Sequence, residues 1–385
     1  MATAERTLQV LLIEDDDDQA VLIERQLKRS GNGTIQITRA DRLALGIQAL
    51  QRQHFDTVLL DLNLPDSRGV STCYRICESA PDTPVIAMTA VDMAADGVRL
   101  VREKAEDYFP KINLDGEFIL RAIYCAVERT ERRRAEGQLN HAAGQLEAAR
   151  RIQSALLPEK APQIQGFEVA GISEPAEMVG GDYFDFLVAP DGTVFIALGD
   201  IAGHGPAAAM MMAVATGSLR TAFWLGGDVG TLLTRVNAVL EHFPPRTTMM
   251  TMMIVELKPA SRTFHYASAA HPFGYLIDSR GTLKRRLNVE TDVPLGIVGN
   301  HVFETSPLMT LEPGEAILIV SDGVLESGIS RHQQFGEPPL LSTVEENYDK
   351  PVSEIVKSIV AAAADFRQGN PAEDDITVVI VRASK

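Results

Sequence analysis

The chain is poor in cysteine, in aromatic residues and in long apolar runs. Three of its 385 residues are cysteine, one is tryptophan and 6% are aromatic. Three cysteines without metal-site spacing argue against a disulfide framework and predict buried, reduced thiols. No apolar run reaches the roughly 18 residues of a membrane span, and no signal peptide precedes the first apolar segment. We therefore expect a cytoplasmic protein that does not bind a membrane.

Positive charge is scarce as well. The chain has 36 Lys and Arg against 52 Asp and Glu, which gives a net charge of −16. Nucleic-acid binding depends on basic surface, and the chain has no basic helix-turn-helix pattern, so no nucleic-acid partner is expected. Hydrophobic residues make up 45% of the chain, enough for more than one core. The length predicts about two or three domains.

Five short apolar segments alternate with amphipathic segments of helical period in the first third of the chain. The apolar segments are LQVLLI, TIQIT, DTVLLD, TPVIAM and EDYFP. This alternation predicts an α/β fold with a five-stranded, parallel, doubly wound sheet that is covered on both faces. Ligands of such sheets bind beyond the carboxyl ends of the strands, which is where the sequence places Glu14, Asp15, Asp61 and Thr89.

A stretch without proline, from about residue 116 to residue 157, predicts one long helix that ends at Pro158. An imperfect heptad seam runs along it, formed by Ile123, Leu139, Ala142, Leu146, Ala149 and Gln153. Such a seam indicates a short coiled coil, and with it a homodimer. The alternative is a connector that packs on its own chain, because a half-apolar helix needs some partner surface.

The rest of the chain, from about residue 166 to residue 385, has mostly strand-like segments. They are FEVAGIS, TVFIALGD, TMMTMMIVEL, FHYASAA, FGYLID, EAILIVSD and DITVVIVR. Helical stretches at about 206–224, 228–243 and 351–367 interrupt them. Runs of strands with grouped helices predict an α+β sandwich.

The acidic residues of the first third suit phosphoryl transfer to a carboxylate. Such a site needs a nucleophilic Asp, a divalent ion and a cation that neutralises the developing charge. Asp61 supplies the nucleophile, and Glu14 and Asp15 offer hard oxygens to Mg²⁺. Lys111 supplies the cation, and Thr89 offers a hydroxyl to the phosphoryl group.

The segments IEDD, LLDLNLPDSRG, AMTA and DYFPK, in this order, closely resemble the response-regulator receiver family over residues 8 to about 127. The resemblance implies phosphorylation of Asp61 by a sensor histidine kinase, with Mg²⁺ held by the acidic residues. It also implies that Thr89, Tyr108 and Lys111 form the switch that responds to the phosphoryl group.

Four further aspartates follow a second pattern. Asp182, Asp200, Asp322 and Asp374 lie in VGGDYFD, GDIAGHG, SDGVLES and EDDITVV, each at the end of a strand or beside glycine. Glycine lets the backbone approach closely, so several carboxylates can converge on metal ions. Two ions that share carboxylates can deliver a water molecule in line to a phosphoester.

These motifs closely resemble the metal-dependent protein phosphatase (PPM) family over about residues 150–383, and within it the SpoIIE/RsbU-like bacterial branch. The resemblance implies two Mn²⁺ or Mg²⁺ ions, bridged by Asp200. The ligands that it implies are Asp182, Asp200, the backbone carbonyl of Ile201, Asp322, Asp374 and, as the alternative to its neighbour, Asp375.

One segment departs from that family's pattern. The branch has an Asn-Ala-Gly-His type of sequence where this chain has Ser268, Ala270 and His271 in YASAAHPFGYL. A substrate contact made there by relatives is therefore not expected to carry over. The roles of His271, and of His204 in GHG, stay open.

Together the patterns predict three parts: a receiver domain (1–127), a helical connector (128–157) and a phosphatase domain (158–385). We expect a response regulator whose phosphorylation at Asp61 controls hydrolysis of phosphoserine or phosphothreonine on a protein. The resemblance implies a phosphorylated anti-sigma-factor antagonist as that protein. The alternative is a non-catalytic receiver–pseudophosphatase adaptor that binds a sigma factor or an anti-sigma factor. Retention of all the metal carboxylates favours the enzyme.

Overall fold

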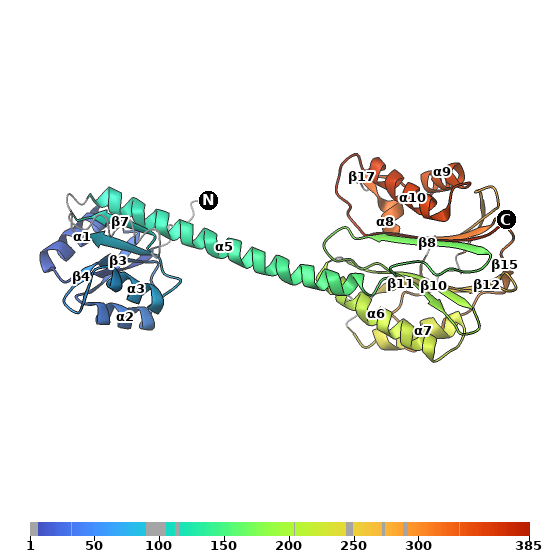
Figure 1. The fold of residues 1–385 in the computed structure, drawn as a ribbon, viewed down its shortest axis with the longest axis horizontal. Coiled ribbons are helices and arrows are strands. Elements are labelled where there is room, and N and C mark those ends of the chain that lie inside the picture. Colours follow the sequence, from blue (N-terminus) through green and yellow to red (C-terminus); the bar gives the residue numbers. More distant parts are fainter. Residues whose placement is uncertain are drawn as a thin grey trace. The chain divides into compact units, whose positions relative to one another are not determined.

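The computed structural model describes residues 7–31, 33–89, 105–111, 115–203, 205–243, 249–271, 274–287, 292–330 and 332–385. The chain forms two compact units, an N-terminal unit of residues 1–142 and a C-terminal unit of residues 143–385 (Figure 1). The three predicted domain limits, at 127, 157 and 385, stay predictions.

The N-terminal unit contains the predicted five-stranded parallel sheet. Its strands lie in the order β2-β1-β3-β6-β7, and each neighbouring pair is parallel. Their bounds are β1 Leu8–Ile13, β2 Ile35–Ala40, β3 Thr57–Asp61, β6 Val85–Thr89 and β7 Asp107–Pro110. The strand order reverses direction at β1, so a crevice opens between the carboxyl ends of β1 and β3.

Helices cover both faces of this sheet. They are α1 Asp17–Ser30, α2 Leu43–Arg52, α3 Val70–Ser79 and the first turns of α5 Gly116–Ser154. Residues of α1 and α5 form one apolar cluster with the sheet, and residues of α2 and α3 form the other. The small ribbon of β4 (Asn63–Leu64) and β5 (Ser67–Arg68) follows β3. The doubly wound α/β prediction is confirmed.

Helix α5 is 39 residues long and confirms the predicted long helix. Its first turns are buried in the N-terminal unit through residues such as Ile119 and Ile123. Residues 131–145 are exposed, and Leu139 of the heptad seam is 70% exposed. The coiled coil stays a prediction. Within the described ranges, no helix is both long and apolar enough to cross a membrane.

The C-terminal unit is built on two five-stranded antiparallel sheets. Their orders are β15-β12-β11-β10-β9 and β14-β13-β16-β19-β8. The bounds of the first sheet are β9 Tyr183–Val188, β10 Val194–Ile201, β11 Met250–Lys258, β12 Thr263–Ala269 and β15 Met309–Thr310. Those of the second are β8 Phe167–Glu174, β13 Gly274–Ile277, β14 Leu283–Arg286, β16 Ala316–Val320 and β19 Ile376–Ala383.

The two sheets stack face to face between two layers of helices (Figure 1). Helices α6 Pro206–Trp224 and α7 Val229–Leu240 pack on the first sheet. Helices α8 Asp322–Glu326, α9 Glu337–Asn347 and α10 Val352–Phe366 pack on the second. A third apolar cluster fills the space between the sheets, and all eight residues of β10 are buried. The predicted α+β sandwich is confirmed. A two-stranded ribbon, β17 Gly328–Ser330 with β18 Gln333–Gln334, lies outside both sheets.

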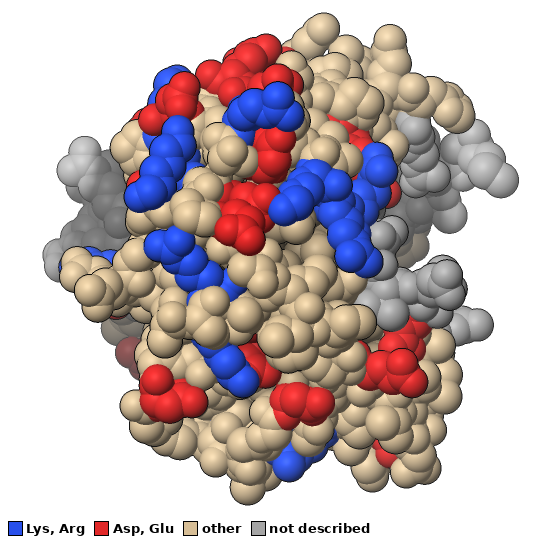
Figure 2. Space-filling model, turned by 90° about the vertical axis from the view of Figure 1, so that its right-hand side faces the viewer, with Lys and Arg blue, Asp and Glu red and all other residues tan. Residues whose placement is uncertain are grey.

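Basic and acidic side chains are interspersed on the face of the molecule drawn in Figure 2, and the described residues there form no continuous basic area. This mixed surface agrees with the acidic composition.

Candidate functional site

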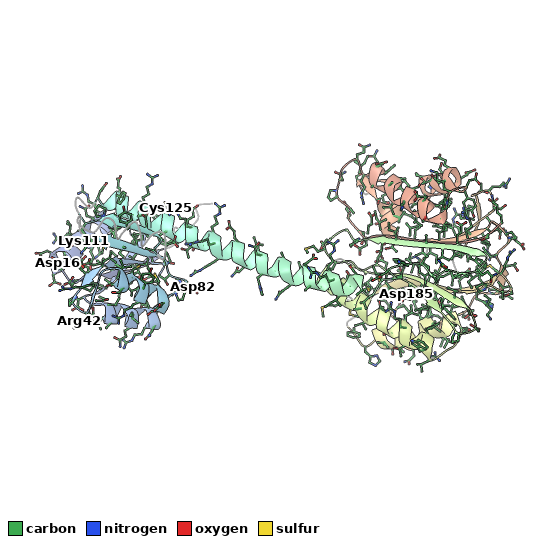
Figure 3. The ribbon with its side chains drawn as sticks, viewed as in Figure 1. Asp16, Arg42, Asp82, Lys111, Cys125 and Asp185 are labelled. Carbon is green, nitrogen blue, oxygen red and sulfur yellow. The ribbon has the colours of Figure 1, made fainter. Side chains whose placement is uncertain are left out.

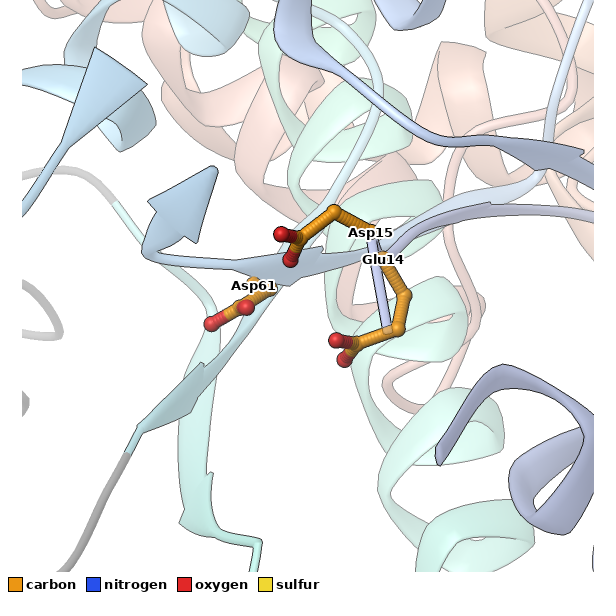
Figure 4. A group of neighbouring side chains, drawn as sticks. All are labelled: Glu14, Asp15 and Asp61. Atoms are coloured by element: carbon orange, nitrogen blue, oxygen red, sulfur yellow. The ribbon is translucent and has the colours of Figure 1, made fainter. Parts of the chain in front are cut away.

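An acidic cluster lies at the carboxyl ends of β1 and β3 in the N-terminal unit. Glu14 and Asp15 directly follow β1, Asp61 ends β3, and β1 pairs with β3. Each of the three offers a carboxylate oxygen, and these oxygens lie within 4.8 Å of one another (Figure 4). Three hard oxygens at this spacing fit a Mg²⁺ ion.

Lys111 reaches this cluster from β7, the edge strand of the sheet. It directly follows β7, and its Nζ lies 2.7 Å from Glu14 Oε2 and 2.9 Å from Asp61 Oδ2 (Figure 3). Burial raises the pKa of Glu14 above its ordinary value, although the ammonium of Lys111 opposes that rise. Lys111 therefore places one cation beside the carboxylates of both Glu14 and Asp61.

The other two residues of the predicted switch are Thr89 and Tyr108, and the structure describes the side chain of Tyr108. Thr89 ends β6, next to β3, but its side chain lies outside the described residues. Tyr108 lies in β7 beside Ala87 of β6, and its half-buried ring packs on the cluster under α2 and α3. Sequence reasoning did not foresee the task of Asp66, whose two oxygens accept the Leu43 and Ala44 amides at the start of α2.

Four aspartates of the C-terminal unit lie at strand ends of the two sheets. Asp182 directly precedes β9, and Asp200 is the last residue but one of the paired strand β10. Asp322 follows β16, and Asp374 precedes the paired strand β19. Each sheet therefore contributes two carboxylates. Within the described residues, these four do not reach the 4.8 Å grouping of the N-terminal cluster.

The charges of the four aspartates affect the pKa values within this group, so the four carboxylates lie near one another. Burial raises the pKa of Asp182 well above its usual range, and the charge of Asp200 raises it further. Burial, followed by the charges of Asp322 and Asp374, raises the pKa of Asp200 to about 7. Burial is also the largest cause that raises the pKa of Asp322. Buried carboxylates that repel one another favour a counter-charge between them.

Two observations fit a divalent cation here. Asp182 Oδ2 and Asp322 Oδ1 are buried and, within the described structure, accept no hydrogen bond. The carbonyl oxygen of Ile201 lies against Gly181, where a Cβ would stand 2.9 Å from it. Carboxylate and carbonyl oxygens are the donors that Mg²⁺ and Mn²⁺ prefer.

Asp375 has a different environment from its neighbour Asp374. Its Oδ1 accepts the Ala176 amide at 2.8 Å, and its Oδ2 accepts the Gly181 and Asp182 amides at 2.5 and 3.2 Å. Three backbone donors occupy this carboxylate, so Asp374 is the better ligand candidate of the pair. Sequence reasoning left the pair unresolved, because Asp375 directly follows Asp374 in the motif.

His271 is buried and joins the two sheets near the aspartates. Its Nδ1 lies 2.9 Å from the Thr251 hydroxyl in β11, and its Nε2 lies 3.0 Å from the carbonyl of Val320, the last residue of β16. Burial lowers the pKa of His271 to about 4. The neutral ring therefore donates from Nε2 to the carbonyl and accepts the hydroxyl at Nδ1. His204 lies outside the described residues.

The turn before His271 shows how the chain accommodates its departure from the family pattern. The Ser268 hydroxyl accepts the His271 amide and lies within hydrogen-bond distance of its carbonyl, both at 3.0 Å. Ala270 has a φ of 53°, in the left-handed region that glycine adopts more readily.

The two units match two family models. Residues 10–123 match the model of the response regulator receiver domain, and residues 190–384 match that of Stage II sporulation protein E (SpoIIE). The chain belongs to the SpoIIE family of PPM phosphatases. PPM phosphatases generally depend on divalent metal ions. This membership agrees with the resemblance that the motifs indicated.

Individual relatives are similar to part of this chain. The phosphoserine phosphatase RsbU of Bacillus subtilis is 27% identical over 238 residues, which cover 62% of this chain and 70% of RsbU. Protein IcfG of Synechocystis sp. is 26% identical over 265 residues, and the match spans 41% of IcfG. The solved SiaA-PP2C domain of Pseudomonas aeruginosa has a TM-score of 0.56 at 22% identity, and covers 64% of this chain and 98% of that domain. The likeness to the solved domain concerns the fold.

Proposed function

We propose that this protein is a two-component response regulator whose output is a metal-dependent serine/threonine protein phosphatase. The observation that carries the proposal is that buried Asp182 and Asp200 of one sheet lie near half-buried Asp322 and Asp374 of the other, whose charges act on Asp200. Repelling carboxylates in a buried site destabilise the fold, and a protein retains them where they bind cations.

The resemblance to the PPM family implies a role for each of the aspartates. Asp200 would bridge two ions, Asp182 and the Ile201 carbonyl would complete one site, and Asp322 and Asp374 the other. When bound, two Mn²⁺ or Mg²⁺ ions supply an activated water in line with the phosphoester. All four carboxylates must be deprotonated to bind, so the raised pKa of Asp200 makes cation affinity increase with pH.

The receiver would act through Asp61. Glu14, Asp15 and Asp61 would hold a Mg²⁺ ion, and a sensor histidine kinase would supply the phosphoryl group. Lys111, at 2.9 Å from Asp61 Oδ2, would then pair with the phosphoryl oxygens. Thr89 and Tyr108 would respond as the switch.

The connector would carry the response to the phosphatase. Helix α5 starts in the receiver core and ends in the C-terminal unit. The exposed Leu139 supports a coiled-coil homodimer, because a second copy would cover this seam residue. We propose domain limits of 1–127, 128–157 and 158–385, as the sequence patterns predict.

The substrate would be a phosphorylated protein. The relative RsbU is named a phosphoserine phosphatase, which supports phosphoserine as the substrate group. A phosphorylated anti-sigma-factor antagonist is our candidate. The adaptor alternative would bind a sigma factor or an anti-sigma factor without turnover, and the retained aspartates argue against it.

The experiment is Mn²⁺-dependent hydrolysis of an aryl phosphate, and then of phosphorylated antagonist candidates, by the full-length protein. Asp200→Asn should reduce turnover to background, because the loss of a bridging carboxylate weakens both ion sites. Asp191→Asn, on the exposed turn between β9 and β10, is the matched control. Retained Mn²⁺-dependent turnover in a folded Asp200→Asn protein would exclude this site. A parent protein that binds a sigma or anti-sigma factor but hydrolyses no phosphoester would favour the adaptor.

A further inference from the structure

The loop between β8 and β9 brings Asp182 to the carboxylate site. It spans residues 175–182, contains no helix or strand, and ends in two glycines directly before Asp182. Its backbone polar groups need partners from elsewhere in the fold, because the loop forms no ladder of its own. Those partners decide where the Asp182 carboxylate lies.

On one side of the loop stands Asp375, which accepts the Gly181 and Asp182 amides. Gly180 lies so close to it that a Cβ would overlap the Asp375 carboxylate. A residue larger than glycine therefore does not fit at this position of the loop.

A second partner of the loop is Gln153, in the last turn of α5. Its Nε2 donates to the Gly180 carbonyl at 2.6 Å, and its Oε1 accepts the Gly180 amide at 3.1 Å. One carboxamide thereby pairs with both polar groups of a single residue. A two-point contact sets the orientation of a peptide as well as its position.

The end of α5 is itself attached to β9. Arg220 donates to the Leu156 carbonyl at 2.7 Å and to Asp185 Oδ2 at 2.9 Å. The same Asp185 oxygen accepts the hydroxyl of Tyr183, the residue after Asp182, at 2.7 Å. Figure 3 labels Asp185 in this region of the C-terminal unit. The helix end and the start of β9 therefore belong to one network of hydrogen bonds.

We propose that Gln153 is a positioning residue of the phosphatase site, whose carboxamide holds the Gly180 backbone so that Asp182 faces Asp200. The inference rests on the proposed function, since it concerns the cation that these two aspartates would share. The heptad pattern placed Gln153 in a seam between two chains, yet its side chain is engaged within its own chain. The connector helix thus supplies a part of the cation site's support that the predicted phosphatase domain, 158–385, lacks.

The test compares full-length Gln153→Ala and Gln153→Glu with the parent and with Arg150→Ala, an exposed control on the same helix. Glutamate keeps the shape of glutamine and the acceptor for the Gly180 amide, but it places a second acceptor against the Gly180 carbonyl. Mn²⁺ binding is followed by electron paramagnetic resonance of the free ion, and turnover is measured against Mn²⁺ concentration. An ion bound in the receiver contributes equally to every variant and cancels in the comparison.

Both Gln153 variants should bind one Mn²⁺ equivalent about tenfold more weakly, the usual effect of losing a group that orients a ligand. Their turnover should recover towards the parental value at high Mn²⁺, and Arg150→Ala should match the parent throughout.

A Gln153→Glu protein with parental Mn²⁺ affinity overturns the inference, because a role in packing alone predicts that result. Should Gln153→Ala fail to fold, the Glu variant decides. If the parent is active and the variants match it, the positioning role alone fails. If the folded parent neither binds Mn²⁺ in the C-terminal unit nor hydrolyses phosphoester, the proposed function fails as well.

Discussion

Acidification should destabilise the C-terminal unit through His271. The ring is 2% exposed and lies between the Thr251 hydroxyl and the Val320 carbonyl. Protonation at Nδ1 would turn the acceptor of the Thr251 hydroxyl into a donor and would bury a charge. The folded state therefore disfavours protonation of the ring. Burial lowers the pKa of His271 from the ordinary 6.5 to about 4.

The sign and size of the effect follow from linkage. The pKa of His271 is lower in the folded state than in the unfolded state, so the unfolded state binds more protons between about pH 6.5 and pH 4. The contribution of the neutral ring is complete above pH 6.5 and is lost as the pH falls through this window. Between about pH 7.5 and about pH 5 the loss is about 2 kcal/mol, at about 1.4 kcal/mol per pKa unit.

Other groups titrate in the same range, so the prediction concerns a difference between two proteins. The raised pKa values of Asp182 and Asp200 act in the opposite direction, because protonation favours the folded state there. His271→Gln keeps a donor for the Val320 carbonyl and has no charge to gain. Urea unfolding of both proteins without divalent ions is followed by far-ultraviolet circular dichroism, because the one tryptophan, Trp224, is already 79% exposed in the folded state.

The free energy of unfolding of the parent should fall by about 2 kcal/mol more than that of His271→Gln over this pH range. This result would mean that the uncharged ring of His271 links the two sheets through its hydrogen bonds. Parallel pH profiles for the two proteins would refute the reasoning, because they would mean that the ring titrates alike in the folded and unfolded states.

Three further predictions concern other parts of the chain. Asp61→Asn should abolish labelling by acetyl phosphate, whereas Asp66→Ala should keep the labelling and lower the stability of the N-terminal unit by about 1 kcal/mol, because α2 loses its cap. Ala270→Gly should stabilise the C-terminal unit by about 0.5–1 kcal/mol in thermal unfolding, since a φ of 53° strains alanine. Replacing Leu139 and Leu146 with Lys should reduce self-association in light scattering and should remove the response of the phosphatase to phosphorylation, while basal turnover continues.

Each of these has a clear contrary result. Hydroxylamine-labile phosphate on Asp61→Asn would assign the acceptor to another aspartate. An unchanged or lower melting temperature of Ala270→Gly would show that the turn tolerates alanine without strain. If the variant with Lys at positions 139 and 146 keeps the full response to phosphorylation, α5 only links the two units and does not transmit the response.

Sequence patterns were sufficient for the fold class of both units. Hydrophobic alternation along residues 8–125 predicted the parallel sheet, because strand and helix periods are local properties of the chain. The rule that ligands bind at the carboxyl ends of parallel strands brought Glu14, Asp15 and Asp61 together before any geometry was known. The predicted ligand roles of the C-terminal aspartates and of the switch residues stay predictions.

Strand pairing in the C-terminal unit was beyond the reach of the sequence. Strand β8 opens the unit and pairs with the last strand, β19, so that Phe167 lies opposite Ala383. A period of two tells which face of a strand is buried, but it does not tell which strand is its neighbour. Only the assembled sandwich decides that pairing.

The sequence by itself determined which kinds of residue meet: carboxylates, glycines and a lysine at the ends of buried strands. The tertiary structure alone decided how neighbouring or periodic residues divide their tasks. Asp375 holds a loop 193 to 199 residues away, and Gln153 leaves its heptad seam for Gly180, 27 residues along the chain. The physical reason is that a short motif specifies local conformation, whereas the direction of a side chain depends on which distant backbone groups still need hydrogen-bond partners.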